Sequence, residues 1–308
     1  MRGPAELCDP FRERLDAFTC ELPRVHKGEA AALHRARVAA RRLRELLPLL
    51  QIDRNTTRKL DRRLRKVTKH LGAVRELDVL MTLVEDLGQS DRYEPTAVEQ
   101  LRAAVAAARK TARDRLHAKL PLAKMEHLSR RLERVGRHLE EGFGKAGRER
   151  TGHSRRASTW ALEARVARRA VRLGQALAVG GAVYASQQLH GVRIVLKKLR
   201  YAAELLPHPR DPRVTADFSI LKTAQDLLGR LHDLEVLVEH VRQIQAASTP
   251  PDLTAWRHLG SLVHAVEDDC RQLHAGFIHE RASLIAVAER MAGAPVRTAA
   301  IERRAAGQ

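Results

Sequence analysis

The 308-residue chain is poor in aromatic residues and in cysteine. Aromatic side chains make up only 3% of it, which disfavours single-strand nucleic-acid binding, because such proteins stack aromatic rings on successive bases. The three cysteines, Cys8, Cys20 and Cys270, lie far apart without a C-x-x-C pair. The sequence therefore predicts neither a disulfide framework nor a cysteine-rich zinc site.

Long hydrophobic runs are also absent. The longest, around residues 176–183, is far shorter than the roughly 20 residues that cross a bilayer. The first six residues do not lead into the apolar core of a secretory signal. We therefore expect a cytoplasmic protein without a membrane span.

Basic residues outnumber acidic ones, with 56 Lys and Arg against 37 Asp and Glu and a formal net charge of +19. Such an excess predicts an anionic partner, which could be nucleic acid, an anionic membrane surface or another polyanion. The hydrophobic fraction of 44% is enough to form a core. The length fits two domains or one domain with an internal duplication.

Helical periodicity runs along the chain, and strand patterns are absent. The periodic segments are rich in Ala, Leu, Arg, Glu and Lys, which favour helices, and prolines separate several of them. The predicted helices span residues 29–47, 56–71, 76–87, 94–120, 122–141, 157–178, 183–206, 214–228, 233–246 and 253–292. We predict an all-α protein, with a polar linker at residues 142–156.

Two motifs occur twice in the same order. Residues 33–44 and 189–200 both read L-H-x-x-R-[VI]-x-x-[RK]-[RK]-L-R, and residues 71–80 align with residues 228–237. Two motifs that share nearly the same offset indicate a tandem duplication into two homologous helical bundles. The predicted boundaries are an N-terminal extension at 1–25, repeat one at about 26–142, a linker at about 143–156, repeat two at about 157–292, and a C-terminal tail at 293–308.

Each copy of the first motif places basic residues on one helical face. At about 100° per residue, positions i, i+3, i+7 and i+10 fall within roughly 80° of arc. Like charges at this spacing repel one another, so we expect something outside the helix to compensate them. These two basic stripes consist of His34, Arg37, Arg41 and Arg44, and of His190, Arg193, Lys197 and Arg200.

The helix that leads into each Leu-Gly pair repeats the spacing. Its glycine lets a neighbouring backbone or a ligand approach closely. If the two copies pack around a pseudo-twofold axis, the four helices line one shared basic groove or cavity that suits a linear polyanion. The positions are Arg65, Thr68, Gly72 and Arg75 in one copy, with Lys69 beside them, and Lys222, Gln225, Gly229 and His232 in the other.

These motifs and their duplication resemble the CHAD family (conserved histidine α-helical domain) over roughly residues 26–292. The resemblance implies a pair of four-helix bundles enclosing a basic cavity that binds inorganic polyphosphate, often at polyphosphate granules. It implies a stand-alone member, because no E-x-E-x-K motif of a triphosphate-tunnel (CYTH) domain occurs. The stripes and the resemblance together assign polyphosphate binding to His34, Arg37, Arg41, Arg42, Arg44, Arg65, Lys69, Arg75, His190, Arg193, Lys197, Lys198, Arg200, Lys222 and His232.

Two other functions stay open at this point. A nucleic-acid-binding protein fits the charge, although no helix-turn-helix signature is present. A metal-dependent phosphohydrolase is suggested by the pair His232 and Asp233, but such enzymes need further ligands, and the first copy has Arg75 and Glu76 instead. We expect no catalytic residues, metal or cofactor, and the oligomeric state is left open.

Charged residues outside the stripes have structural explanations. We expect the carboxylates after each Leu-Gly pair (Glu76, Asp78, Asp233 and Glu235) to cap the next helix or to pair with stripe residues. Basic residues outside the repeated frame, such as Arg35 and Arg130, are expected to serve only solubility and diffuse electrostatics.

Overall fold

The computed structural model describes residues 4–50, 52–90, 92–145, 151–180, 182–206, 212–247 and 252–305. Side chains are described for residues 8–50, 52–90, 92–141, 160–180, 182–206, 212–247 and 252–293. All regular secondary structure in these ranges is helical, which confirms the all-α prediction. No helix in this part of the chain combines the length and hydrophobicity needed to span a bilayer.

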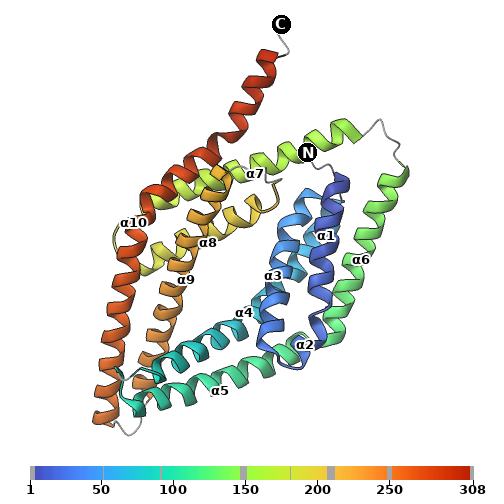
Figure 1. Ribbon diagram of the computed structural model, residues 1–308. Coiled ribbons are helices and arrows are strands. Elements are labelled where there is room, and N and C mark those ends of the chain that lie inside the picture. The colour runs from blue at the N-terminus through green and yellow to red at the C-terminus, as the bar shows by residue number, and fades with distance from the viewer. Residues whose placement is uncertain are drawn as a thin grey trace. The chain divides into compact units, whose positions relative to one another are not determined.

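The helices belong to two compact units (Figure 1). Unit 1 consists of Met1–Ser158 and Gln243–Leu259, and unit 2 of Thr159–Arg242 and Gly260–Gln308. Unit 1 contains α1 (Pro4–Thr19), α2 (Leu22–His26), α3 (Ala30–Leu46), the 3-10 helix η1 (Leu47–Leu49), α4 (Arg54–Gly88), α5 (Pro95–Lys119) and α6 (Leu122–Lys145). Unit 2 contains most of α7 (Thr151–Val179), α8 (Ser186–Ala203), and most of α9 (Pro212–Ala247) and α10 (Leu253–Ala305).

The helix α4 begins at a capping residue and is longer than predicted. The Asp53 carboxylate accepts hydrogen bonds from the backbone N–H groups of Asn55, at 2.8 Å, and Thr56, at 3.0 Å. The sequence predicts a break after Leu71, but the helix continues to Gly88, and α9 continues through its Leu-Gly pair in the same way. Buried residues on both sides of each glycine extend the apolar stripe, which outweighs the roughly 1 kcal/mol cost of an interior glycine.

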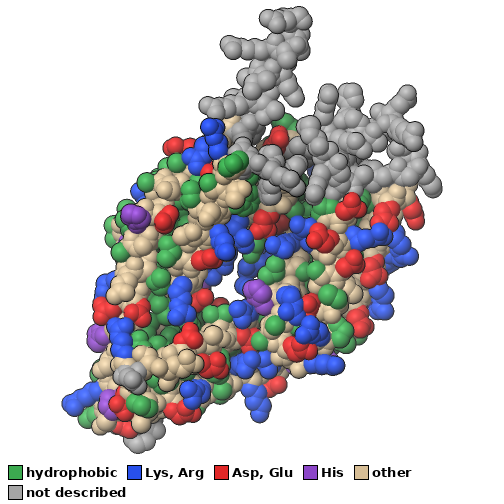
Figure 2. All heavy atoms as spheres, viewed as in Figure 1, with side chains coloured by type: hydrophobic (Ala, Val, Ile, Leu, Met, Phe, Trp, Pro, Cys, Tyr) green, Lys and Arg blue, Asp and Glu red, His purple; other side chains and the backbone are tan. Residues whose placement is uncertain are grey.

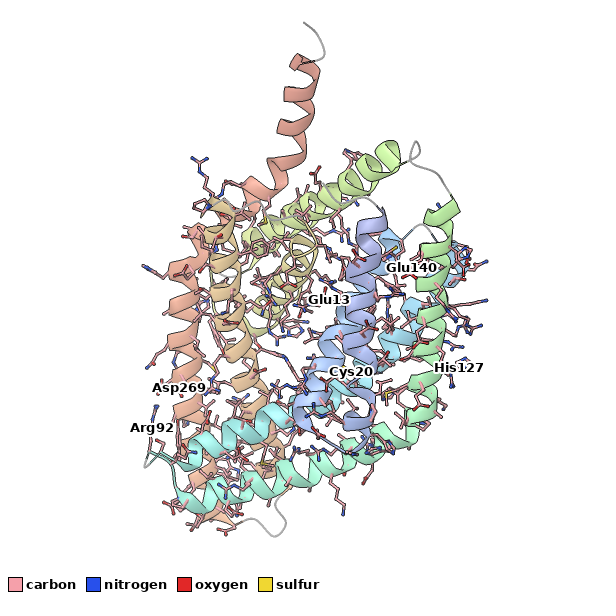
Figure 3. All side chains as sticks on the ribbon, turned by 45° about the vertical axis from the view of Figure 1, so that its right-hand side comes forward. Glu13, Cys20, Arg92, His127, Glu140 and Asp269 are labelled. Atoms are coloured by element: carbon pink, nitrogen blue, oxygen red, sulfur yellow. The ribbon has the colours of Figure 1, made fainter. Side chains whose placement is uncertain are left out.

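The N-terminal helix α1 supplies core side chains to unit 1. Phe11 and Phe18 are fully buried and Leu15 is nearly so, and α1 packs against α3 and α6. An ion pair between Arg12 and Glu140 of α6, which is labelled in Figure 3, joins the two helices at 2.8 Å. The segment predicted as an N-terminal extension is thus built into the bundle of unit 1.

The predicted linker at residues 142–156 is largely helical. The helix α6 runs to Lys145, and α7 begins at Thr151. Residues 146–150 lie outside the described residues. The polar, glycine-containing composition of this segment therefore does not prevent helix formation at residues 142–145 and 151–156.

Unit 2 has one apolar core, to which α7, α8, α9 and α10 all contribute. Leu173, Leu196, Leu228 and Phe277, one from each helix, are buried in it. In both units a helix of 17 or 18 residues (α3 or α8) precedes one of 35 or 36 residues (α4 or α9). This order fits the duplication, which stays a prediction.

Candidate functional site

In unit 1, the basic stripe of α3 lies beside basic residues of α4, and the two helices pack against each other. Near the start of α3, the charges of Arg75 and Arg37 act on the His34 imidazole. One turn later, a Cβ atom placed on Gly72 would lie 3.5 Å from Arg37 Nε. The helices α3 and α4 therefore run antiparallel. The N-terminal stripe positions of α3, such as Arg37, lie beside C-terminal motif positions of α4, such as Gly72.

The other end of this helix pair contains a carboxylate that the stripe analysis did not consider. Arg44 Nε donates to Asp61 Oδ1 at 2.9 Å, and Arg65 Nη2 donates to Asp61 Oδ2 at 3.2 Å. Asp61 thus neutralises part of the charge of two predicted ligand-binding residues. At this end of the stripe, the compensating group outside α3 is therefore a carboxylate of the protein itself, on α4.

In unit 2, α8 and α9 meet in the same register. His190 Nδ1 lies 3.4 Å from His232 Nδ1, with the ring centroids 4.6 Å apart. At the other end, Arg200 Nε donates to Gln225 Oε1 at 2.8 Å, and Arg200 also pairs with Glu204, one turn later on α8, at 2.8 Å. The end of this stripe is therefore also neutralised within its own unit.

The stripes flank the core and do not point into it. The residues of α3 that are buried are apolar, from Ala32 to Leu46, whereas His34 is exposed and Arg37 and Arg41 are half-buried. In α8 the buried residues are likewise apolar, and Arg193 and Lys197 are half-buried. Both helices thus hold cations at the edge of the core, where solvent still reaches them.

Several cations lie close enough to the stripe histidines to lower the pKa of their imidazoles. His34 is exposed to solvent on one side, and partial desolvation, followed by the charges of Arg75 and other arginines, lowers its pKa. Burial, followed by the charges of Arg193, His190 and Lys197, lowers the pKa of His232 to about 4. These imidazoles are therefore disfavoured as cations in the unliganded protein, and an anion nearby would reverse that preference.

A family model described as the CHAD domain matches residues 10–242 of the chain. The chain belongs to the CHAD family. The resemblance seen in the motifs is thus confirmed. The match begins within α1, in the segment predicted as an extension, and includes both helix pairs.

Two solved structures share the fold of this CHAD chain. PptA from Streptomyces chartreusis is 18% identical, with a TM-score of 0.57, and the match covers 94% of this chain and 99% of that one. The CHAD domain from the plant Ricinus communis is 20% identical, also with a TM-score of 0.57, and the match covers 91% and 89%. No curated protein matches the chain.

The predicted site residues not yet described are either exposed or lie on another side of their helix than the stripe. Lys69 and Lys222 are exposed on α4 and α9. Arg42 and Lys198 lie about 80° around their helices from the first histidine of each stripe, on the side away from the other stripe cations. Helix geometry therefore separates Arg42 and Lys198 from the faces that the other residues share.

Asp78 does not have the role expected of it. This carboxylate is 4% exposed, accepts a hydrogen bond from Arg109 Nε at 2.6 Å and lies 3.5 Å from Arg113 Nη2. It caps no helix, since α4 is continuous here. Sequence reasoning missed Arg109 and Arg113 of α5, whose only signal is a spacing of four residues.

In unit 2, Glu235 occupies the position that aligns with Asp78. Its Oε2 atom lies 4.0 Å from Nδ1 of the stripe residue His232, and its Oε1 atom accepts a hydrogen bond from the Tyr184 hydroxyl at 3.2 Å. Within the described side chains, no group of three or more His, Cys, Asp or Glu is placed to hold a metal ion.

Basic residues outside the stripes also have specific partners. Arg35, expected to serve diffuse electrostatics, donates through Nε and Nη2 to both oxygens of the nearly buried Glu21. Figure 2 shows Lys and Arg side chains scattered among Asp and Glu over the visible face. Net charge alone therefore does not locate a site.

Proposed function

We propose that this CHAD chain binds inorganic polyphosphate through two faces, α3–α4 in unit 1 and α8–α9 in unit 2. The observation that carries the proposal is the shared antiparallel register of basic residues on the two helix pairs. The charge of Arg75 acts on His34 in one pair, and His190 contacts His232 in the other. Membership of the CHAD family supports the same ligand, because polyphosphate binding is what the resemblance of the motifs to that family implies.

A linear polyphosphate suits these faces for two physical reasons. Its negative charge repeats along the chain, and the stripe cations recur at about one helical turn, or roughly 5 Å. Its binding also requires no aromatic stacking, and the chain has few aromatic residues. We extend the proposal to a non-catalytic protein that acts in the cytoplasm at polyphosphate granules.

The test is a titration with long-chain polyphosphate at two salt concentrations. Because binding releases counterions, the logarithm of the association constant should fall linearly with the logarithm of the salt concentration. The double variant Arg37→Glu with Arg193→Glu should lose binding at least a hundredfold and keep its helical circular dichroism. Wild-type affinity in this variant would contradict the proposed faces.

The matched control is Arg130→Glu with Arg172→Glu. Both arginines are exposed, one lies in each unit, and neither belongs to a stripe. The net charge changes equally in the two double variants, so diffuse attraction predicts equal losses. If binding depends on the register of the stripes, the affinity of the control for polyphosphate should fall by less than about threefold.

Competition separates polyphosphate from nucleic acid. At equal concentrations of phosphate groups, unlabelled polyphosphate should displace labelled polyphosphate at least tenfold better than duplex DNA or RNA does. Better displacement by nucleic acid would favour the alternative function, since the charge of the chain suits both polymers.

The proposed absence of catalysis has its own assay. Phosphate release from polyphosphate should be no faster with the protein than without it, in the presence of Mg²⁺ or Mn²⁺. Metal-dependent release that Asp233→Asn abolishes would establish a phosphohydrolase and refute this part of the proposal.

A further inference from the structure

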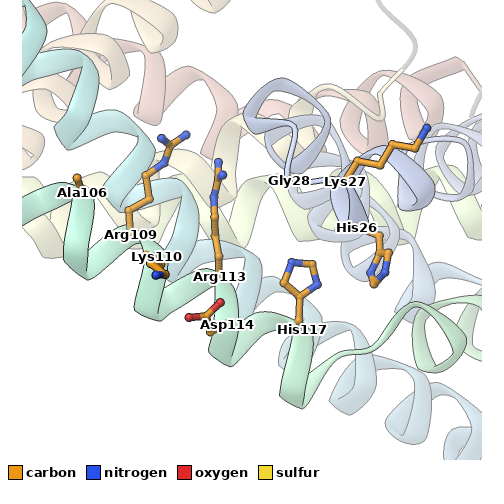
Figure 4. Close-up of a pocket in the computed structure, with 9 residues that line it drawn as sticks. All are labelled: His26, Lys27, Gly28, Ala106, Arg109, Lys110, Arg113, Asp114 and His117. Atoms are coloured by element: carbon orange, nitrogen blue, oxygen red, sulfur yellow. The ribbon is translucent and has the colours of Figure 1, made fainter.

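Unit 1 contains a cavity of about 350 Å³ between the turn that follows α2 and one face of α5 (Figure 4). None of the residues that line it belongs to the stripe of α3 or to the basic face of α4. The cavity is therefore separate in composition from the faces proposed above to bind polyphosphate.

Two arginines of α5 form one wall. Figure 4 shows Arg109 and Arg113 extending from successive turns of α5 toward the same side. The buried Asp78 holds both guanidinium groups from α4. Fixed guanidinium groups bind phosphate oxygens with little further loss of side-chain entropy, which favours an anion here.

The opposite wall comes close to Arg113 because of a glycine. Gly28 has a φ of +85°, the only positive φ among the described residues. A Cβ atom placed on it would lie 3.4 Å from Arg113 Nη1. A side chain at this position would therefore be strained and would crowd the guanidinium group.

The lining carries excess positive charge and few apolar side chains. Lys27 and Lys110 add two exposed cations to the arginines, and only Asp114 in the lining and Asp78 behind it oppose these four charges. Sites for organic ligands are lined mainly by apolar side chains. This cavity contains none larger than Ala106.

Two imidazoles complete the site. The rings of His26 and His117 meet edge to face, with their centroids 5.0 Å apart, and both residues line the cavity. Each imidazole can donate a hydrogen bond to an anion through a ring N–H group.

We infer that this cavity binds a compact condensed phosphate, either free pyrophosphate or the terminal phosphate groups of a longer chain. The site offers four cations against two carboxylates, an excess that favours such an anion, and the volume accommodates two or three phosphate groups. The lack of large apolar side chains disfavours a ligand that must bury a base or an acyl chain. The inference does not depend on polyphosphate binding by the stripes.

Isothermal titration with pyrophosphate at constant ionic strength tests the site. The wild-type protein should bind saturably, and both Arg113→Gln and the double variant Lys27→Ala with Lys110→Ala should bind at least tenfold more weakly. The lysines are exposed, so their removal leaves the fold intact even if Arg113→Gln does not.

The control is Lys124→Ala with Arg130→Ala on α6, which removes the same charge from exposed positions outside the cavity. Its affinity should stay within twofold of the wild type. Wild-type affinity in the lysine variant, an equal loss in the control, or the absence of saturable binding would each overturn the inference.

Two further titrations separate this site from the stripes and identify the source of the phosphate. Pyrophosphate binding should persist in Arg37→Glu with Arg193→Glu, whether or not that variant binds polyphosphate, and its loss there would overturn the inference. Displacement of pyrophosphate by long-chain polyphosphate would support binding of chain ends. Lack of displacement would support free pyrophosphate as the ligand.

Discussion

The helix pairs α3–α4 and α8–α9 share a register but differ in the groups that face one another. In α3–α4, His34 faces an arginine, Arg75, whereas in α8–α9, His190 faces a second histidine, His232. The register follows from the packing of buried apolar residues. The residue type at each aligned position decides the charge there. At this position, therefore, only unit 2 has a contact between two imidazoles.

The glycines of the two pairs differ as well. Gly72 is covered by the Arg37 side chain, whereas a Cβ atom on Gly229 would meet nothing within 4 Å. The same motif glycine thus accommodates a side chain of the protein in one unit and faces open space in the other. A close approach that the sequence predicts for both glycines occurs within the protein only at Gly72.

The largest expected difference between the units concerns the aligned carboxylates Asp78 and Glu235. Asp78→Asn leaves Arg109 and Arg113 half-buried without their counterion, and we expect a loss of about 3 kcal/mol in unfolding free energy. Glu235→Gln should cost less than about 1 kcal/mol, because its hydroxyl partner Tyr184 is uncharged. Urea denaturation followed by circular dichroism measures both. Equal losses would contradict the comparison.

A pH effect of intermediate size should come from His232 of unit 2. The folded-state pKa of His232, about 4, lies below the usual histidine value of 6.5, so between these values the unfolded chain binds the extra proton. The free energy of unfolding should therefore fall as the pH drops from 6.5 toward 4, by roughly 2 kcal/mol after allowance for solvent screening.

The variant His232→Gln should remove this part of the pH dependence, as measured by urea denaturation at several pH values. His127→Gln is the control, since His127 is exposed on α6 (Figure 3). A wild-type slope in His232→Gln, or an equal change in the control, would show that the imidazole contact does not have this effect.

The smallest expected effect comes from the two glycines. Gly229→Ala should raise stability by about 0.5–1 kcal/mol, because alanine favours the helix and its Cβ atom meets only open space. Gly72→Ala should gain less, since its Cβ atom would contact Arg37 Nε at 3.5 Å. Thermal denaturation of the two variants checks the order, and a larger gain at Gly72 would reverse it.

The sequence predicts helices best where the apolar period is regular. The start of α10 at Leu253 matches its prediction, and the ends of α5 differ by one residue. The predicted breaks inside α4 and α9 are wrong, because the buried residues on both sides of each glycine outweigh its local tendency to end a helix. The helix α1 was missed although Phe11, Leu15 and Phe18 carry a helical period, since Pro10 interrupts the segment.

The candidate site was predictable only in part. Spacing along one helix places His34 and Arg37 on a common face, and duplication of the motif points to its importance. Spacing does not show that Asp61 of α4 neutralises Arg44 of α3. That contact depends on how α3 and α4 pack, because residues 17 positions apart along the chain meet only after the helices dock.

By itself, the sequence determined that this protein is all-α and which cations share each stripe, because helical periodicity is a local property of 3.6 residues per turn. Only the tertiary structure decided which cations have counterions and which share a cavity. Asp78 meets Arg109 across 31 positions of sequence, and the turn after α2 meets α5 across a longer separation. Such contacts arise from the packing of whole helices, which no local pattern specifies.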